Sequence, residues 1–454
     1  LTTGLAALAM LALAACGGGD SGDDNSITVW TTDTLPDRVA ATEAIIKKFT
    51  AETGIEVELV GVAEDQFTQT LTSAAAAGDL PDVIGSLSLA SVRTLAANDL
   101  LDTEAAAAVV ESLGEDTFSE TALSLTSDGD TQLSVPSESW AQLLVYRADL
   151  FEQAGLEPPE TYDEITAAAE ELDSGGVSGF VGPTAPGDSF TQQTFEHIAL
   201  ANGCELVDEA GEVVLDSPEC VAAFDFYGNL VTNYSVPGAQ DVDTVRAQYF
   251  AGKAAMIVWS TFILDEMAAL RDDALPSCPQ CKQNPTFLAE NSGFVTALQG
   301  PDGEEPAQFG EVTSWAIPTG DAVDSAQQFV EYLMEPGYED WIAIAPEGKF
   351  PVRDGTAEDP QAYVDTWASL PVGVDRKAPL AEFYPPEVLD VLRTGPDDFD
   401  RWGIAQGQGD LVGAILGELP VPQAVAALAS GEVDAQTAAE DAATSVRSIQ
   451  ESLS

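Results

Sequence analysis

The chain has 454 residues, 45% of them hydrophobic, and 77 acidic residues against 16 lysines and arginines, which gives a formal net charge of −61. This length allows two domains of ordinary size, and the composition is typical of a globular protein. The sequence has no basic stripe that could neutralise phosphates, which argues against a nucleic-acid partner, and the acidic surplus favours a saline environment where salt screens the repulsion.

The first sixteen residues end in Leu13-Ala14-Ala15-Cys16 and resemble a bacterial lipoprotein signal with its lipobox. The apolar stretch before Cys16 is about a dozen residues, too short for a bilayer core that needs ~20. We therefore expect residues 1–16 to be a signal peptide and lipobox. Cys16 is expected to be lipidated and to anchor the protein at the extracytoplasmic face of the cell membrane. Residues 17–25 are rich in glycine and aspartate and are expected to form a flexible tether.

The next part of the chain has the pattern of a β-α-β unit. Residues 27–30 are β-rich, residues 36–52 carry apolar side chains at helical spacing, and residues 55–60 alternate like a strand. A helical stretch at 64–77 and a strand at 82–84 follow. This alternation predicts a parallel sheet covered by helices. Near the other end, residues 422–452 are predicted to form a packed pair of helices.

Seven segments, in a constant order, resemble extracellular solute-binding proteins of the carbohydrate ABC-importer type. They are residues 27–30, 49–57, 77–83, 135–164, 250–257, 315–318 and 326–333. The resemblance implies an α/β, periplasmic-binding-protein-like fold, similar to maltose-binding protein, with two lobes, a hinge and a ligand cleft between the lobes. We expect the N-terminal lobe at 26–139 plus 290–345, and the C-terminal lobe at 140–289 plus 346–454.

The same resemblance implies a substrate-binding lipoprotein of an ABC importer. It would capture an extracellular sugar, oligosaccharide or polyol as a monomer, close around it, and deliver it to the membrane permease, without a cofactor. Two alternatives stay open: a glycoside hydrolase anchored at the cell surface, and a receptor of the same fold for polyamines or another small solute. Catalysis is poorly supported because His197, the only histidine, lies in a predicted helix and no G-x-S-x-G motif occurs. We therefore expect no enzyme activity and no metal site.

Candidate ligand contacts lie where predicted strands end or where the family crosses between lobes. Aromatic rings can stack on the apolar faces of a sugar, and amide, hydroxyl or charged groups can bond its hydroxyls. The aromatic candidates, for which burial in the core remains the alternative, are Trp140, Trp259 and Trp315. The polar candidates are Thr32, Asp33, Gln66, Ser86, Ser88, Ser260 and Arg353.

Four cysteines remain besides Cys16, an even number in a chain that is expected to be exported. We predict two disulfides, Cys204–Cys220 and Cys278–Cys281. A four-cysteine zinc site is the alternative, because Cys278-Pro279-Gln280-Cys281 has ligand-like spacing. A thioredoxin-like role is disfavoured, since that pair lies in a Pro-rich loop with no strand before it.

Overall fold

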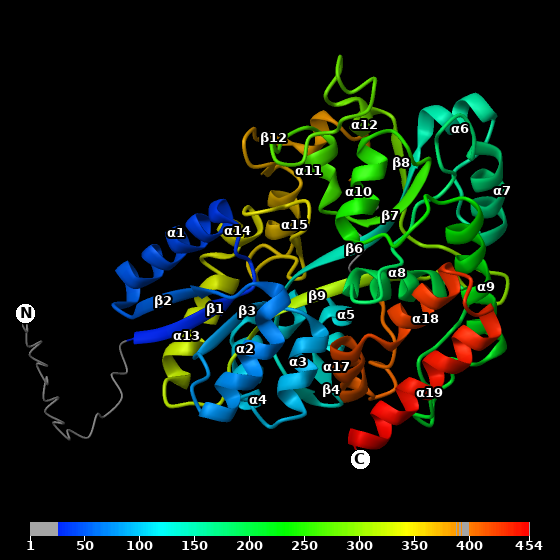
Figure 1. Ribbon diagram of the computed structural model, residues 1–454. Coiled ribbons are helices and arrows are strands. Elements are labelled where there is room, and N and C mark those ends of the chain that lie inside the picture. The colour runs from blue at the N-terminus through cyan, green and yellow to red at the C-terminus, as the bar shows by residue number, and fades with distance from the viewer. Residues whose placement is uncertain (1–25, 387, 390–391, 393–398, 454) are drawn as a thin grey trace, which may run out of the picture.

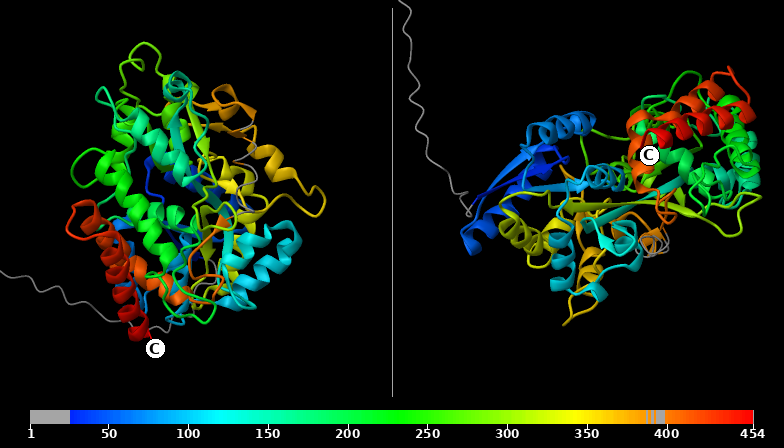
Figure 2. Two further views of the ribbon diagram at one scale, coloured as in Figure 1. Left: turned by 90° about the vertical axis from the view of Figure 1, so that its right-hand side faces the viewer. Right: turned by 90° about the horizontal axis from the view of Figure 1, so that it is seen from below.

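The computed structural model describes residues 26–386, 388–389, 392 and 399–453 (Figure 1). The predicted signal peptide, the lipidated Cys16 and the tether lie outside the described residues. The described chain forms two α/β lobes, which Figure 2 shows side by side and joined by long strands.

The N-terminal lobe is built on the predicted parallel strands. Strand β1 (Ser26–Thr31) pairs in parallel with β2 (Glu56–Gly61) and with β3 (Val83–Leu87). Helix α1 (Pro36–Thr53) and helix α2 (Glu64–Ala77) each end at a glycine in the left-handed conformation, Gly54 and Gly78, where a residue without Cβ carries no steric penalty. The β-α-β-α-β prediction is therefore confirmed.

The remaining elements of this lobe follow in chain order or return to it from later in the chain. They are α3 (Leu89–Ala96), α4 (Thr103–Leu113), α5 (Glu120–Leu125), β4 (Ser127–Asp128), β5 (Thr131–Gln132), α13 (Val323–Met334) and α14 (Tyr338–Ile342). Helix α13 packs on α4 and α1, so the returning segment covers the sheet of the first lobe.

Two strands carry the chain between the lobes. The first part of β6 (Val135–Arg147) pairs with β9 (Gln308–Ala316) and β10 (Phe350–Pro351). Its second part pairs with β7 (Met256–Ser260) and β8 (Ser292–Val295) of the C-terminal lobe. Strand β9 also pairs with β3 at one end and with β13 (Phe399–Asp400) at the other. These two strands are the structural hinge on which the site is built.

Helices enclose the C-terminal lobe and complete the chain. Its earlier helices are α6 (Ala148–Ala154), α7 (Tyr162–Leu172), α8 (Ser189–Leu200), α9 (Pro218–Asn233), α10 (Val242–Phe250), α11 (Ile263–Met267) and α12 (Phe287–Glu290). Its later helices are α18 (Pro420–Ala429) and α19 (Ala435–Leu453). Helix α17 (Gly409–Glu418) precedes them and packs chiefly on α3 of the N-terminal lobe, and also on α19. The predicted terminal helix pair is confirmed, since α18 and α19 pack on each other and on α9.

Two segments lie in a different lobe from the one we predicted. Strand β8 (Ser292–Val295), expected in the N-terminal lobe, pairs with the second part of β6 in the C-terminal lobe. Residues 350–367, which include α15 (Ala362–Trp367), were expected in the C-terminal lobe. The backbone N–H of Ser119 donates to Val352 O at 2.8 Å, and that of Asp354 donates to Thr117 O at 2.8 Å. We therefore assign this segment to the N-terminal lobe. It is followed by the short pair β11 (Pro371–Val372) and β12 (Ala378–Pro379).

Both predicted disulfides are present. Cys204 is bonded to Cys220, and Cys278 is bonded to Cys281. The zinc alternative is wrong, because all four sulfur atoms are paired with each other. Within the described residues no single helix is long and apolar enough to cross a membrane; only α17 and α18, taken together across a 49° bend, meet that test.

Candidate functional site

A row of three aromatic rings crosses the hinge between the lobes. The ring centroids of Trp140 in β6 and Phe309 in β9 are 6.1 Å apart, and the centroid of Phe262, two residues after β7, lies 6.5 Å from that of Trp140. Phe309 is fully buried, whereas Trp140 and Phe262 are half-buried. We call these three residues the aromatic row. Its two half-buried members offer flat apolar faces to a bound molecule.

Arg401 lies at one end of the aromatic row. Its guanidinium carbon is 4.5 Å from the centroid of Phe309. Arg401 Nε donates to Glu196 Oε1 at 3.0 Å, and Nη1 donates to Glu311 Oε2 at 2.9 Å. The other oxygen of Glu311 accepts from the backbone N–H of Leu89 at 2.8 Å. A buried ion-pair network thus joins α8, β9 and the start of α3, which belong to different lobes.

A small cavity of about 50 Å³ lies beside Arg401, between α3, α8 and α17. It has room for a few water-sized groups. Its polar lining residues are Ser88, Ser189, Gln192, Gln193, Glu196, Glu311 and Arg401. Gln192 is 4% exposed, and its side-chain oxygen makes no hydrogen bond within the described structure. Buried acceptors of this kind suit a hydroxyl or water donor.

Arg38 of α1 lies at the opposite end of the aromatic row. Its guanidinium carbon is 5.2 Å from the centroid of Phe262. Arg38 Nη1 donates to Asp33 Oδ1 at 3.4 Å, and Nη2 is 3.9 Å from Glu347 Oε1. The ring of Phe262 also packs against Gly348, where a Cβ would lie only 2.1 Å from the ring. The N-terminal lobe therefore reaches across to Phe262 of the C-terminal lobe.

The loops after β1 and β3 meet close to this end. Thr32 Oγ1 donates to the backbone oxygen of Ser86 at 3.1 Å. Ser86 has a φ of +56°, which is uncommon for a residue with a side chain and is found at functional sites. Ser88 caps helix α3 by accepting from the backbone N–H of Ser91. The structure thus brings the predicted residues Thr32, Ser86 and Ser88 to neighbouring positions at the carboxyl ends of β1 and β3.

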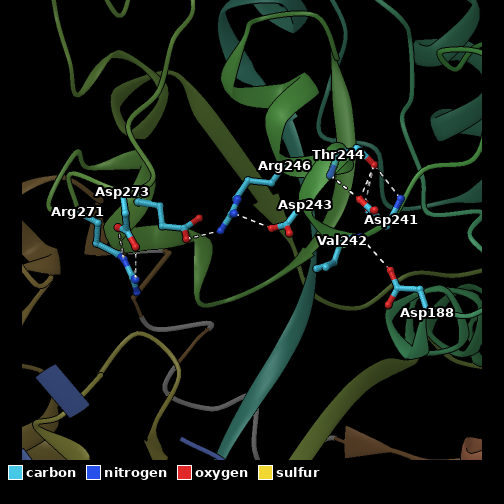
Figure 3. Close-up of polar contacts among 9 residues, drawn as sticks. Asp188, Asp241, Val242, Asp243, Thr244, Arg246, Arg271 and Asp273 are labelled. Carbon is cyan, nitrogen blue, oxygen red and sulfur yellow. Dashed lines mark hydrogen bonds and ion pairs between the residues drawn. The ribbon is translucent and has the colours of Figure 1, made fainter. Parts of the chain in front are cut away.

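Carboxyl groups accumulate behind Phe262. Burial, above all, raises the pKa of Asp265 to about 9 and that of Glu266 to about 7, and it also raises the pKa of Glu347. Arg246 Nη1 donates to Glu266 Oε1 at 2.7 Å, and Figure 3 shows the same guanidinium bonded to Asp243. The surroundings of Phe262 are therefore polar and acidic.

Two predicted contacts belong to the core instead. Trp315 is fully buried, with its ring centroid 4.8 Å from that of Trp341 and its indole against Gly85. Arg353 is 1% exposed and is used up within the N-terminal lobe, since Nη2 donates to Leu113 O at 2.7 Å and Nη1 donates to Met334 O at 2.6 Å. Neither side chain reaches the aromatic row, so we no longer assign ligand contacts to them.

Three further predicted residues have mixed positions. Trp259 is 5% exposed and packs against Phe190 at 4.8 Å, which makes it mainly a core residue of the C-terminal lobe. Ser260 is half-buried at the end of β7, two residues before Phe262. Gln66 is exposed in the first turn of α2, with no contact to the aromatic row among the described residues.

The sequence reasoning did not single out Phe262, Phe309, Arg38, Arg401 or Glu347 as site residues. Phe262 had a local signal, since it follows the end of the predicted strand by two residues. The other four were missed chiefly because the contacts that place them at the site are far away in the chain: Arg401 bonds residues 90 and 205 positions away. Arg38 also bonds Asp33, only five positions away, but that pairing gave no sign of its contact with Phe262.

The described residues contain no constellation for metal binding. No group of three or more His, Cys, Asp and Glu within the described ranges could hold a metal ion. His197 is buried in α8, its Nδ1 accepts from the backbone N–H of Phe309 at 3.1 Å, and burial lowers its pKa to about 3. Its role is structural, as a neutral acceptor beside the hinge.

Residues 32–340, more than half of the chain, match the family described as bacterial extracellular solute-binding protein. A protein of Escherichia coli K12, named "Putative ABC transporter periplasmic-binding protein YcjN", is 28% identical over 326 residues, which cover 70% of each chain.

Solved structures share the fold. A solute-binding protein of an ABC transporter from Thermotoga lettingae, bound with α-D-tagatose, has a TM-score of 0.71 at 20% identity and covers 94% of this chain and 99% of its own. A sugar transporter structure from Arthrobacter chlorophenolicus with bound laminaribiose has a TM-score of 0.71 at 18% identity, covering 93% and 99%. The two-lobed α/β fold that the sequence predicted is thus confirmed.

Proposed function

The chain belongs to the family of bacterial extracellular solute-binding proteins, and from this membership we propose that it is the substrate-binding component of an ABC importer for a sugar, oligosaccharide or polyol. The observation that carries the proposal is the aromatic row, with half-buried Trp140 and Phe262 at the junction of the two lobes. A carbohydrate presents apolar C–H faces that stack on such rings and hydroxyls that bond polar groups around them.

The polar partners would come from both ends of the row. Asp33, Arg38 and Ser86 lie at one end, and Ser88 and Arg401 lie at the other. Capture would follow from closure of the lobes about β6 and β9, and release from a permease that favours the open form. The residues that surround the row come from both lobes, so ligand and closure would stabilise each other.

The cellular setting is part of the same proposal. We propose lipidation at Cys16, a membrane-anchored monomer that faces the extracytoplasmic side, and adaptation to high salt, for which the net charge of −61 is the support. The matched family and the relatives described above are binding proteins, which favours a receptor over a glycoside hydrolase. A solute receptor requires no covalent step.

Thermal unfolding with a solute panel tests this proposal. The purified protein in molar salt is heated with mono-, di- and oligosaccharides, polyols, polyamines and peptides. A ligand at a hundred times its dissociation constant stabilises the bound form by ~2.7 kcal/mol. A sugar or polyol that raises the melting temperature and is recovered intact supports the proposal. A sugar recovered cleaved supports the hydrolase, and a shift with polyamines or peptides alone overturns the substrate class.

A further inference from the structure

Two carboxyl groups near Phe262 are buried with too few polar partners to compensate a charge. Asp265 is 1% exposed, and neither of its oxygens accepts a hydrogen bond within the described structure. Glu347 is 2% exposed, its Oε2 has no partner there, and its Oε1 lies 3.9 Å from Arg38, beyond hydrogen-bond distance. Burying a carboxylate is unfavourable unless a cation or several donors compensate it.

The basic groups around these carboxyls are already engaged elsewhere. Arg38 of α1 donates to Asp33, and Arg246 of α10 bonds both Asp243 and Glu266. Figure 3 shows Arg271, which follows α11, paired with Asp273 through two bonds of 3.2 and 3.0 Å.

The other charged or titratable groups that face the pair do not neutralise it. Tyr384 donates its hydroxyl to the backbone oxygen of Leu264, and Lys377 is exposed. Within the part of the chain that the structure describes, the surroundings of Asp265 and Glu347 therefore contain no cation that fully compensates a charge on either carboxyl.

Both carboxyls adjoin a face that a ligand would use. Glu347 precedes Gly348, whose backbone packs against the Phe262 ring, and Asp265 lies in helix α11, which begins directly after Phe262. The group that covers this ring is Arg38, which comes from the opposite lobe. Opening of the lobes would carry Arg38 away from Phe262 and expose a ring with two carboxyls beside it. An aromatic face next to carboxylates is a favourable environment for a cationic group.

We propose that the ligand is an amino sugar, whose ring stacks on Phe262 and whose protonated amine pairs with Asp265 and Glu347. This inference rests on the proposed function and specifies its substrate class. It assigns Asp265 and Glu347 as ligand-binding residues, for which the resemblance to the family and the strand ends gave no indication.

A proton balance distinguishes an ammonium group from a hydroxyl at this position. Burial, together with the charges of Glu347 and Glu266, raises the pKa of Asp265 to about 9, so this carboxyl carries a proton at pH 6.5 before the ligand arrives, a pH at which a sugar amine in solution is also largely protonated. An ammonium group placed against it favours the carboxylate and expels that proton. A neutral hydroxyl expels none. Binding of an amino sugar should therefore release close to one proton, and binding of its neutral analogue should not.

Titration calorimetry with matched disaccharides provides the test. Fully deacetylated chitobiose carries amines where cellobiose carries hydroxyls, and N,N′-diacetylchitobiose removes the charge but keeps the nitrogen. We expect the deacetylated disaccharide to bind at least tenfold more tightly than the other two, with proton release that appears as a heat dependent on the buffer's ionisation enthalpy. Equal or tighter binding of cellobiose would overturn the inference and leave the proposed function standing. If no sugar, polyol or other carbohydrate binds, both fail.

Substitutions locate the effect. Glu347→Gln and Asp265→Asn should each remove the preference for the amine and the proton release, and both should leave binding of neutral disaccharides within a few-fold. Glu358→Gln, an exposed carboxyl of the same chain region, is the matched control and should change neither. If both Glu347→Gln and Asp265→Asn still prefer the amino disaccharide, the assignment of these two residues as ligand contacts is overturned. If a variant fails to fold, proton release by the unsubstituted protein still tests the inference. Stronger binding of spermidine than of the amino disaccharide would overturn the proposal that the ligand is a sugar.

Discussion

The guanidinium of Arg401 lies over the face of the Phe309 ring, with its central carbon 4.5 Å from the ring centroid. Two buried carboxylates, Glu196 and Glu311, hold it in that place. Because Glu311 also accepts from the backbone of Leu89, the pair ties the end of the aromatic row to both lobes. This arrangement makes Arg401 important both for stability and for the shape of the site.

Loss of Arg401 should therefore be costly. Arg401→Ala leaves two buried carboxylates unpaired, and we expect the free energy of unfolding to fall by about 3–5 kcal/mol. Urea unfolding followed by circular dichroism measures it. Lys48→Ala removes a cation from an exposed pair with Asp340 and should change the stability by less than about 1 kcal/mol. A similar small loss for Arg401→Ala would contradict the buried network.

Substitutions of half-buried and fully buried aromatic residues should affect ligand binding and stability differently. Trp140→Ala should weaken binding of whichever sugar raises the melting temperature by about tenfold or more, with a modest effect on stability, since the ring is half-buried. Phe262→Ala should behave alike. Trp315→Ala empties a core position between Trp341 and Gly85 and should cost about 3–5 kcal/mol of unfolding free energy. Calorimetry and chemical unfolding on each variant measure both quantities, and equal loss of stability at position 140 would make Trp140 a core residue.

The local elements of this fold could be predicted from sequence because their signals are local. Helix α2 has the predicted bounds, and α1 differs from its predicted bounds by one residue. Both ends could be predicted because a glycine directly follows the C-terminus of each helix. The site was predicted only in part. Asp33 and Ser86 follow predicted strands, and Trp140 lies where the family crosses between lobes, so these three positions could be predicted. A tryptophan such as Trp315, in contrast, gives no sign in sequence of whether its face points to the core or to a ligand.

Contacts between distant segments could not be predicted in the same way. Arg38 meets Glu347 across more than three hundred residues, and a chain with 77 acidic residues offers too many possible partners for one arginine. The position of residues 350–367 in the N-terminal lobe was missed for the same reason. The order of the family-like segments along the chain predicted where the chain crosses between lobes, but it carried no information about how residues 350–367 pack.

The disulfide between Cys204 and Cys220 should contribute measurably to stability. It joins residues 16 positions apart, and a loop of that size contributes ~3 kcal/mol in the chain-entropy account. The double substitution Cys204→Ser and Cys220→Ser should lower the free energy of unfolding by about that amount. The Cys278–Cys281 disulfide closes a loop of only three positions, so the double substitution Cys278→Ser and Cys281→Ser should lower the free energy of unfolding by less. Thiol titration of the unsubstituted chain after denaturation, with Cys16 absent, should find no free thiol; two free thiols would contradict the pairing.

Salt should stabilise the protein strongly. A net charge of −61 produces repulsion that is screened when the Debye length falls from ~10 Å at 0.1 M to ~3 Å at 1 M. We expect the melting temperature to rise steeply with NaCl over this range. Sucrose strengthens burial without screening charge and is the control. Glu170→Gln with Glu171→Gln removes two adjacent exposed charges of α7 and should make the salt dependence shallower. A melting temperature independent of NaCl would argue against salt adaptation.

The buried carboxyl Asp265 should make the stability depend on pH, and its substitution should remove that contribution. Its pKa is about 9 in the folded protein, against an ordinary value of 3.8, so the folded state binds a proton that the unfolded chain releases. The stabilisation is complete below pH 3.8 and is lost progressively as the pH rises toward 9. His197, with a folded pKa of about 3 and an ordinary value of 6.5, acts in the opposite direction between those two values, so the fall from Asp265 is clearest above pH 6.5.

Asp265→Asn keeps the shape of the neutral carboxyl and cannot ionise. We expect it to raise the free energy of unfolding by a few kcal/mol at pH 8 and by about 1 kcal/mol at pH 5. Urea unfolding at the two pH values measures the difference, and Asp365→Asn, an exposed carboxyl, is the control. An equal effect at both pH values would show that Asp265 is ionised in the folded protein. A gain in stability joined to a loss of amine preference would show that this buried carboxyl is kept for binding at the expense of stability. Substitution of a residue without a role in binding would give the first effect without the second.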